Sequence, residues 1–195
     1  MIEYEPPVYR PPGEWRSFLV QATIGCSHNG CTFCGMYKGK KYRVRPMEDI
    51  IGDIREAAAF YNQYEKVFLC DGDAIAMDTE DLLEIIAEIK KDFPHCRLIS
   101  TYAGPKSTLK KTPEELKRLH EAGLGRAYLG IETGTEEILK STNKGVDRAQ
   151  MLEAGLRLRN AGIDLWGIVL IGLGGKELSA ENARETAKII NEMKP

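Results

Sequence analysis

Long hydrophobic runs are absent from this 195-residue sequence, and no stretch reaches the roughly 18 consecutive apolar residues that a membrane span requires. An excess of one charge is lacking too, because 27 Lys and Arg residues face 29 Asp and Glu residues. That balance gives no support for general binding to nucleic acid. The first residues also lack the basic and then apolar zones of a signal peptide. We therefore expect a cytoplasmic protein that has no contact with a membrane.

Cysteine is scarce, and its five residues form an odd number. Without a signal peptide, this argues against a disulfide framework and for reduced thiols. Low-complexity segments and strong internal repeats are also missing. What the sequence does have is 43% hydrophobic and 29% charged residues, a composition typical of a folded domain that can bury a sizeable core.

Apolar runs alternate with helical patterns through most of the chain. Thr112-Pro113-Glu114-Glu115 has the N-cap, the proline and the glutamate of a capping box, and Gly123 can end that helix. Other helices are predicted over 47–61, 82–93, 146–160 and 180–193, and strands near 17–24, 67–70, 97–101, 127–131 and 167–171. This order predicts an α/β fold with a parallel sheet and helices packed on it.

The segments that follow the predicted strands are rich in glycine, polar residues or cysteine. In parallel α/β folds, chemistry is found at the carboxyl ends of the strands. The first of these segments also belongs to a long loop, 25–46, and long loops in compact domains are usually functional. We therefore expect one site to be built from residues 25–35, 71–74, 101–104, 132–134 and 172–175.

Three of the five cysteines, Cys26, Cys31 and Cys34, fall within nine residues of that loop. Three thiolates on one loop suit either an iron–sulfur cluster or a zinc ion. A closed zinc site needs a fourth ligand, which His28 or Cys70 could supply. Without a fourth ligand, one metal position stays open for a substrate or a cofactor. At this point both the cluster and the zinc interpretation remain.

The first strand, the three-cysteine loop ending in Cys-x-aromatic-Cys, and the run of βα units resemble the radical S-adenosylmethionine (radical SAM) superfamily. The tract 132–145 is similar to the branch of oxygen-independent coproporphyrinogen oxidase and the MiaB-type enzymes. The resemblance implies a partial (β/α) barrel, of whose expected six βα units five are visible. It further implies a core domain over 17–195 that we expect to be truncated, leaving an exposed strand edge. The residues before it, 1–16, are a Pro-rich extension.

The same resemblance implies two cofactors, a [4Fe–4S] cluster and S-adenosyl-L-methionine (SAM). Cys26, Cys31 and Cys34 match the cluster ligands of the family, in which the remaining iron is chelated by the amino and carboxylate groups of SAM. Reduction of the cluster then cleaves SAM to a 5′-deoxyadenosyl radical, which abstracts a hydrogen atom from the substrate. An external reductant such as a flavodoxin or ferredoxin is implied as a partner.

Further residues match the family's cofactor contacts. Phe33 corresponds to the aromatic residue beside the adenine, Asp73 to the acid that contacts the methionyl amino group, and Glu132 to the acid that binds the ribose. Residues 168–175 resemble the adenine segment, but a glycine stands at 175 where the family has Glu. Asp71 and Asp73 could instead be plain turn formers, and Thr101 and Tyr102 plain packing residues. The candidate cofactor contacts are Phe33, Asp71, Gly72, Asp73, Thr101, Glu132, Leu170 and Gly172.

The spacing of the cysteines departs from the family pattern. Four residues separate Cys26 from Cys31, where the usual gap is three. Asn29 and Gly30 can both adopt positive φ, so the extra residue could be looped out. Cluster binding is therefore still expected.

Other notable residues have ordinary explanations. Cys70 and Cys96 are expected to be buried and inert, His95 and His120 to face solvent, and Trp15 and Trp166 to belong to the core. The five basic residues of 38–45 form either a solvated loop or a clamp for an anionic substrate.

The sequence thus predicts a radical SAM enzyme of unknown, small-molecule or macromolecular substrate. One alternative is a zinc-stapled α/β binding domain without redox chemistry. Another is an RNA-modifying radical SAM enzyme, so nucleic acid stays possible as a partner but is not favoured. No second cluster motif accompanies the first, which counts against the methylthiotransferase type.

Overall fold

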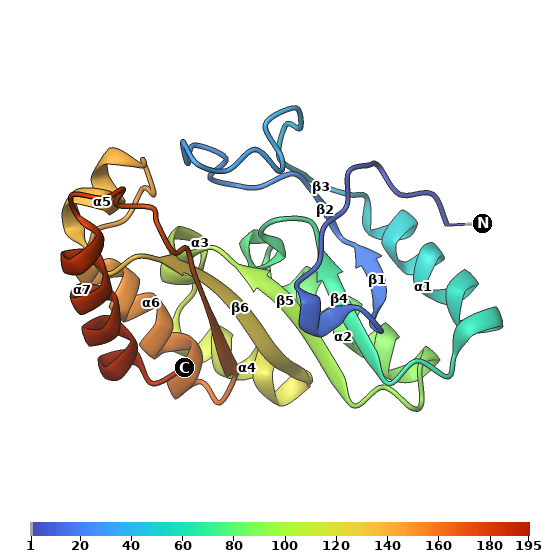
Figure 1. Cartoon of the computed structure of the whole chain (residues 1–195). Helices are drawn as coiled ribbons and strands as arrows, with labels where there is room; N and C mark the ends of the chain where they lie inside the picture. The colour runs from blue at the N-terminus through green and yellow to red at the C-terminus, as the bar shows by residue number, and fades with distance from the viewer. Residues whose placement is uncertain (1) are drawn as a thin grey trace.

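A five-stranded parallel sheet forms the centre of the computed structural model, which describes residues 2–195; Met1, part of the expected extension 1–16, lies outside the described residues. The strands follow one another in space in their chain order (Figure 1). Every neighbouring pair is parallel, as the alternating pattern predicts. The strands are β1 (Phe18–Gln21), β4 (Lys66–Cys70), β5 (Leu98–Ala103), β6 (Leu124–Glu132) and β7 (Asp164–Val169).

The helices that connect these strands pack against one another in sequence along one face of the sheet, which gives an open, partial barrel (Figure 1). Two six-residue helices, α3 (Pro105–Lys110) and α5 (Glu136–Ser141), were not expected, because segments this short show no helical periodicity. None of the described helices is both long and apolar enough to span a membrane. The helices are α1 (Met47–Tyr61), α2 (Thr79–Asp92), α3 (Pro105–Lys110), α4 (Pro113–Ala122), α5 (Glu136–Ser141), α6 (Arg148–Asn160) and α7 (Ser179–Met193).

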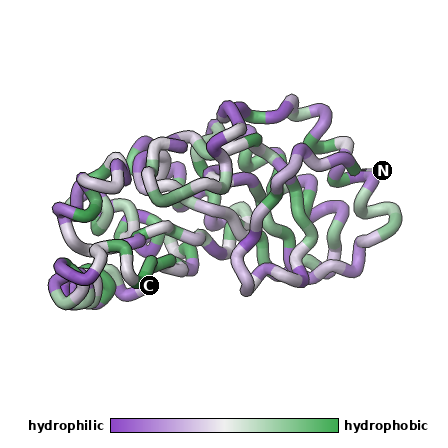
Figure 2. The backbone as a smooth tube through the Cα atoms, turned by 45° about the horizontal axis from the view of Figure 1, so that its top comes forward, coloured by the Kyte–Doolittle hydropathy of each residue, from purple (hydrophilic) through white to green (hydrophobic). Residues whose placement is uncertain are grey.

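The main hydrophobic core fills the space between the sheet and these helices. The predicted apolar stripe of α2 is buried along its whole length, from Leu82 to Phe93. Figure 2 shows hydrophobic segments, in green, alternating with hydrophilic segments, in purple, along the chain. In α1 the stripe is shorter than expected, because Tyr61 at the last turn is 50% exposed.

The predicted capping box at α4 is present. Glu115 N donates to Thr112 Oγ1 at 3.1 Å, and Thr112 N donates to Glu115 Oε2 at 2.7 Å. Gly123 follows the helix with φ of 132°, a conformation in which a side chain would be strained. Asp147 forms a second capping box, with Gln150, at the start of α6.

The expected strand over 17–24 is split in two. After Gln21 the chain leaves the main sheet, and β2 (Thr23–Ile24) pairs antiparallel with β3 (Arg43–Val44). Ala22 lies at the break, where its N–H bonds to the carbonyl of Cys70 and its carbonyl accepts from Arg45 N. This small hairpin closes the long loop 25–42 at its base.

Both tryptophans contradict the expectation that they belong to the core. Trp166 is 45% exposed because β7 is the last strand of the sheet, and Trp15 is 66% exposed at the end of the short 3₁₀ helix η1 (Pro12–Glu14). The predicted strand also ends at Val169, so Ile171 is fully exposed.

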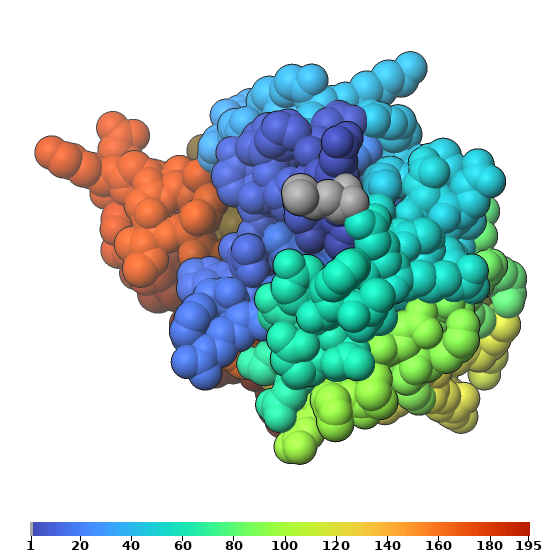
Figure 3. Space-filling model, turned by 90° about the vertical axis from the view of Figure 1, so that its right-hand side faces the viewer, coloured from blue at the N-terminus to red at the C-terminus, as the bar shows by residue number. Residues whose placement is uncertain are grey.

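The N-terminal extension is packed against the fold. Tyr4 Oη donates to Leu19 O, and Lys40 Nζ donates to the carbonyls of Glu5 and Pro7. In Figure 3 this segment lies, in dark blue, directly beneath the lighter blue loop that carries Lys40. Further along, the buried carboxylate of Glu14 accepts a hydrogen bond from Tyr128 Oη at 2.6 Å.

Candidate active site

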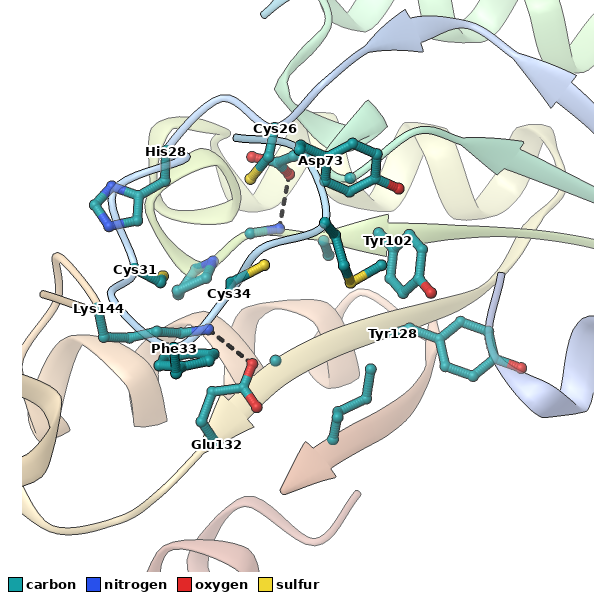
Figure 4. A pocket seen from close by; sticks show the side chains of 18 of the residues that line it. Cys26, His28, Cys31, Phe33, Cys34, Asp73, Tyr102, Tyr128, Glu132 and Lys144 are labelled. Carbon is teal, nitrogen blue, oxygen red and sulfur yellow. Dashed lines mark hydrogen bonds and ion pairs between the residues drawn. The ribbon is translucent and has the colours of Figure 1, made fainter. Parts of the chain in front are cut away.

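A cavity of about 360 Å³ lies where the strands β4, β5 and β6 end, under the cysteine loop (Figure 4). Four of the five segments expected to meet there do so; the fifth, 172–175, does not line the cavity. The predicted residues that the structure brings together in the lining are Cys26, Cys31, Phe33, Cys34, Gly72, Asp73, Glu132 and Leu170.

The extra residue of the cysteine loop is accommodated at Asn29, which has φ of 41°. Its side-chain amide donates to the carbonyls of Tyr37 at 2.8 Å and Lys40 at 3.2 Å, so the turn is tied back to the end of its own loop. Gly30 does not adopt positive φ. One left-handed residue is thus enough to absorb the four-residue gap.

The loop is also docked on the chain that follows α5. Thr32 N donates to Thr142 O at 2.9 Å, and Asn143 Nδ2 donates to Gly30 O at 3.0 Å. A ring nitrogen of His28, Nε2, lies 2.7 Å from Asn143 O. His28 lines the cavity, but this contact ties that nitrogen to the chain after α5.

Burial raises the pKa of the thiols of Cys26 and Cys31 above the ordinary value, and for Cys31 the nearby Lys144 ammonium acts in the opposite direction. The effect of burial follows from the cost of holding a thiolate away from water, and the effect of Lys144 follows from the attraction between its positive charge and the thiolate. Among residues 2–195, no three His, Cys, Asp or Glu side chains converge closely enough to surround a single metal ion. In an iron–sulfur cluster each cysteine binds a different iron, so its ligands need not converge on one point.

Asp73 is buried at the end of β4, beside the loop. One carboxylate oxygen accepts from Gly104 N at 2.7 Å, and the other accepts from the hydroxyls of Ser27 and Ser107. Burial raises the pKa of Asp73, while these three hydrogen bonds oppose that effect. The side chain therefore connects the cysteine loop to the start of α3.

Glu132 ends β6 with φ of 64° and forms an ion pair inside the cavity, in which Lys144 Nζ lies 3.0 Å from Glu132 Oε1 (Figure 4). A side chain at Gly130 would meet the Glu132 carboxylate and would push that flexible side chain aside, so glycine leaves room for the ion pair. Lys144 also lies over the Phe33 ring, 5.8 Å from its centroid. Lys144 could not be found from the sequence, because a lysine twelve residues after its partner follows no periodic pattern.

Three predicted cofactor contacts lie outside the cavity lining. Asp71 is fully buried beside Lys40, and its carboxylate also accepts from Gly25 N and Gln21 Nε2. Thr101 is buried and donates to backbone carbonyls, while Gly172 is exposed beyond β7. Asp71 lies outside the lining because its side chain faces the base of the β2–β3 hairpin, whereas the side chain of Asp73, two residues later, faces the cavity.

The basic segment 38–45 is mostly engaged in internal contacts. Lys40 is the buried partner of Asp71, Arg43 pairs with Glu5, and Arg45 pairs with Asp53 at 2.7 Å. Lys38 Nζ donates to Asn29 O. These contacts favour a structural role over an anion clamp.

The remaining cysteines and histidines lie away from the cavity. Cys70 is buried, with its thiol toward Val20 O, and Cys96 is half-buried. His95 is exposed as expected. His120 is only half-exposed, and its buried Nδ1 has no hydrogen-bond partner in the described chain, which corrects the expectation for this residue.

Aromatic and other apolar residues, together with Lys106, also line the cavity. Tyr102 was a candidate from its place at the end of β5, and it does line the cavity. Met36, Tyr37, Tyr128 and Ile168 also line it, but nothing in their sequence context distinguishes them from core residues.

Comparison with known proteins identifies relatives of this arrangement. A family model described as the radical SAM superfamily matches residues 20–190. The chain is 31% identical over 169 residues to 4′-phospho-dehydrooxetanocin synthase of Priestia megaterium, covering 76% of this chain and 22% of that protein.

Solved structures resemble the fold at lower identity. The radical SAM methyltransferase TsrM from Kitasatospora setae, with cobalamin and a [4Fe–4S] cluster bound, has a TM-score of 0.72 at 18% identity and covers 98% of this chain and 39% of its own. Coproporphyrinogen III oxidase (HemN) from Escherichia coli has a TM-score of 0.67 at 18% identity, over 92% of this chain and 42% of its own. The chain thus spans less than half the length of each of these proteins.

Proposed function

The chain belongs to the radical SAM superfamily, whose members are enzymes that use a [4Fe–4S] cluster and SAM, and on this basis we propose that it binds both cofactors in the cavity under the cysteine loop. The single observation that carries the proposal is the shared lining: three cysteines of one loop and two acids from the ends of β4 and β6 face the same space.

The residues present fit the two cofactors. Cys26, Cys31 and Cys34 offer three soft sulfur donors, and no fourth cysteine lines the cavity among the described residues. Three donors leave one iron of a four-iron cluster without a protein ligand, and that iron can bind a further group. The cavity volume of about 360 Å³ also lies in the range of small-molecule sites.

Each cavity residue then has a distinct task. Asp73 positions the cysteine loop through Ser27, and Glu132 presents a carboxylate that can accept hydrogen bonds from hydroxyl groups. Lys144 supplies a positive charge next to the thiol of Cys31 and so favours its thiolate. Phe33 offers an apolar surface in the same wall.

Cys26, Cys31 and Cys34 would hold the cluster, which would supply one-electron chemistry: reductive cleavage of SAM to methionine and a 5′-deoxyadenosyl radical able to take a hydrogen atom from substrate. The electron must come from outside the chain, so we propose a flavodoxin- or ferredoxin-like reductant as a partner. Thiols that must stay reduced are consistent with a cytoplasmic location, which we also propose.

Anaerobic reconstitution with iron and sulfide tests cluster binding. We expect four irons and four sulfides per chain and a visible charge-transfer absorption band, and we expect all three to be lost when Cys26, Cys31 and Cys34 are replaced together by Ala. The matched control is Cys96→Ala, which removes a thiol outside the cavity and should leave the band unchanged. A band that survives the triple replacement, or one zinc per chain without iron, would refute the proposal.

The second measurement is the formation of 5′-deoxyadenosine from SAM by the reconstituted, dithionite-reduced protein. We expect product from the natural chain and none from the triple cysteine variant. Glu132→Gln should weaken SAM binding, because it removes a charged acceptor from the cavity. Equal SAM affinity of this variant and the natural chain would contradict the role of Glu132.

A further inference from the structure

A row of aromatic side chains crosses the face of the sheet opposite the helices. Tyr102 on β5, Tyr128 on β6 and Trp166 on β7 are register partners, so their side chains point to the same face. Ring centroids are 6.3 Å apart between Tyr102 and Tyr128 and 5.6 Å apart between Tyr128 and Trp166. Phe68 on β4 extends the row, 5.1 Å from Tyr102.

Two members of this row, Tyr102 and Tyr128, line the cavity, together with Met36 and Ile168 (Figure 4). The row therefore continues the wall of the cavity away from the cysteine loop. This part of the lining has no acidic or basic side chain. The charged groups of the cavity lie elsewhere: Glu132 and Lys144 form a pair, Asp73 already accepts three hydrogen bonds, and the ammonium of Lys106 lies beside Gly145.

The polar atoms of the side chains in this row differ in their hydrogen bonding. Tyr128 Oη donates to Glu14 at 2.6 Å, and Trp166 Nε1 donates to Asp164 Oδ2 at 3.1 Å. The hydroxyl of Tyr102 has no hydrogen-bond partner among residues 2–195, although the residue lines the cavity. Burial raises the pKa of Tyr102 well above its ordinary value, so the phenol stays protonated and can donate.

We propose that Tyr102, Tyr128, Met36 and Ile168 form a substrate subsite for an uncharged, flat ring that carries a hydrogen-bond acceptor. The ring packs against the aromatic row, and its acceptor meets the Tyr102 hydroxyl. A charged group is disfavoured there, because this wall holds no opposite charge to offset its loss of hydration. This assignment rests on the proposed function, since it assumes that the cofactors occupy the other end of the cavity, under the cysteine loop.

Three probes that share a benzene ring test the subsite in the reconstituted protein. Acetophenone carries a carbonyl acceptor, ethylbenzene has a similar shape without one, and benzoate carries a charge. Dissociation constants come from ligand-observed saturation-transfer NMR. We expect acetophenone to bind at least about five-fold more tightly than benzoate, because one net hydrogen bond and an uncharged group are both favoured.

The variant Tyr102→Phe removes the hydroxyl and keeps the ring. It should weaken acetophenone about five-fold, as expected for one hydrogen bond, and change ethylbenzene less than two-fold. The matched control is Tyr42→Phe, because the Tyr42 hydroxyl is also unpartnered but lies outside the cavity lining. This control should change neither probe.

Three outcomes would overturn the assignment: no binding of either neutral probe, benzoate binding as tightly as acetophenone, or equal acetophenone affinity in Tyr102→Phe and the natural chain. The comparison of acetophenone with benzoate uses the natural chain alone, so it does not depend on the folding of a variant. Probe binding is also measured separately from 5′-deoxyadenosine formation. A protein that binds the probes but does not cleave SAM would refute the proposed function and leave the subsite standing.

Discussion

Asp71 holds three segments together, and its replacement by Asn is expected to destabilise the fold without touching the cavity. Its carboxylate is fully buried and accepts from Lys40 Nζ at 2.8 Å, Gly25 N at 3.0 Å and Gln21 Nε2 at 3.1 Å. Lys40 in turn holds the N-terminal extension through Glu5 and Pro7. Asn has the same shape, but its NH₂ group would face donors and leave Lys40 with an uncompensated charge.

Breaking a buried ion pair by removing one partner costs about 3–5 kcal/mol. In a domain of this size 1 kcal/mol corresponds to about 2–4 °C, so Asp71→Asn should lower the melting temperature by about 6–20 °C. The double variant Asp71→Asn with Lys40→Met should regain part of this loss, because it leaves no unpaired buried charge.

Thermal unfolding followed by circular dichroism measures this effect. The control is Glu80→Gln, which breaks the exposed pair of Glu80 with Arg118 and should leave the melting temperature unchanged. Below its melting temperature, Asp71→Asn should bind SAM as well as the natural chain does, in contrast to Glu132→Gln. An unchanged melting temperature together with lost SAM binding would refute the structural role and restore Asp71 as a cofactor contact.

Three further predictions concern stability. Gly52 is an exposed glycine inside α1 with open space around its Cα, so Gly52→Ala should raise the unfolding free energy by about 0.5–1 kcal/mol in urea titrations. Gly134→Ala should instead lower it by about 1–3 kcal/mol, because the new methyl group would overlap the backbone carbonyl of Glu185; equal stability of the two alanine variants would contradict both predictions. The Arg55 guanidinium lowers the pKa of Glu88 from its usual 4.5 to about 2, so the ion pair stabilises the fold fully above pH 4.5 and is lost as pH falls through about 2. The stability difference between Glu88→Gln and the natural chain should therefore shrink as pH falls from 4.5 through about 2, and a difference of unchanged size below pH 2 would show that it does not arise from the charge of Glu88.

Elements could be predicted from the sequence alone where residues close together in the chain carry a recognisable pattern. The buried stripe of α2 follows from apolar residues at helical spacing, and the start of α4 follows from Thr112 and Glu115. The three-cysteine loop marked the site for the same reason, since its residues are close in sequence. The parallel strand order followed from the alternation of strands and helices.

Residues whose role depends on distant partners could not be predicted. Asp71 and Asp73 are neighbours in one turn, yet one is paired with Lys40 and the other faces the cavity. Lys144 reaches Glu132 only because the chain returns through α5 to the end of β6. The exposure of Trp166 depends on β7 being the last strand of this sheet, which hydrophobicity does not encode.

The sequence by itself determined the order of the main strands and longer helices, the α/β class and the cysteine donors, because periodicity, capping residues and motif spacing act over a few residues along the chain. Only the tertiary structure decided which acids line the cavity, that Lys40 is a structural residue, and that Tyr102, Tyr128 and Trp166 form one row. These features depend on strand register and on contacts between segments tens of residues apart, and a shift of one residue in register would turn each side chain to the other face of the sheet.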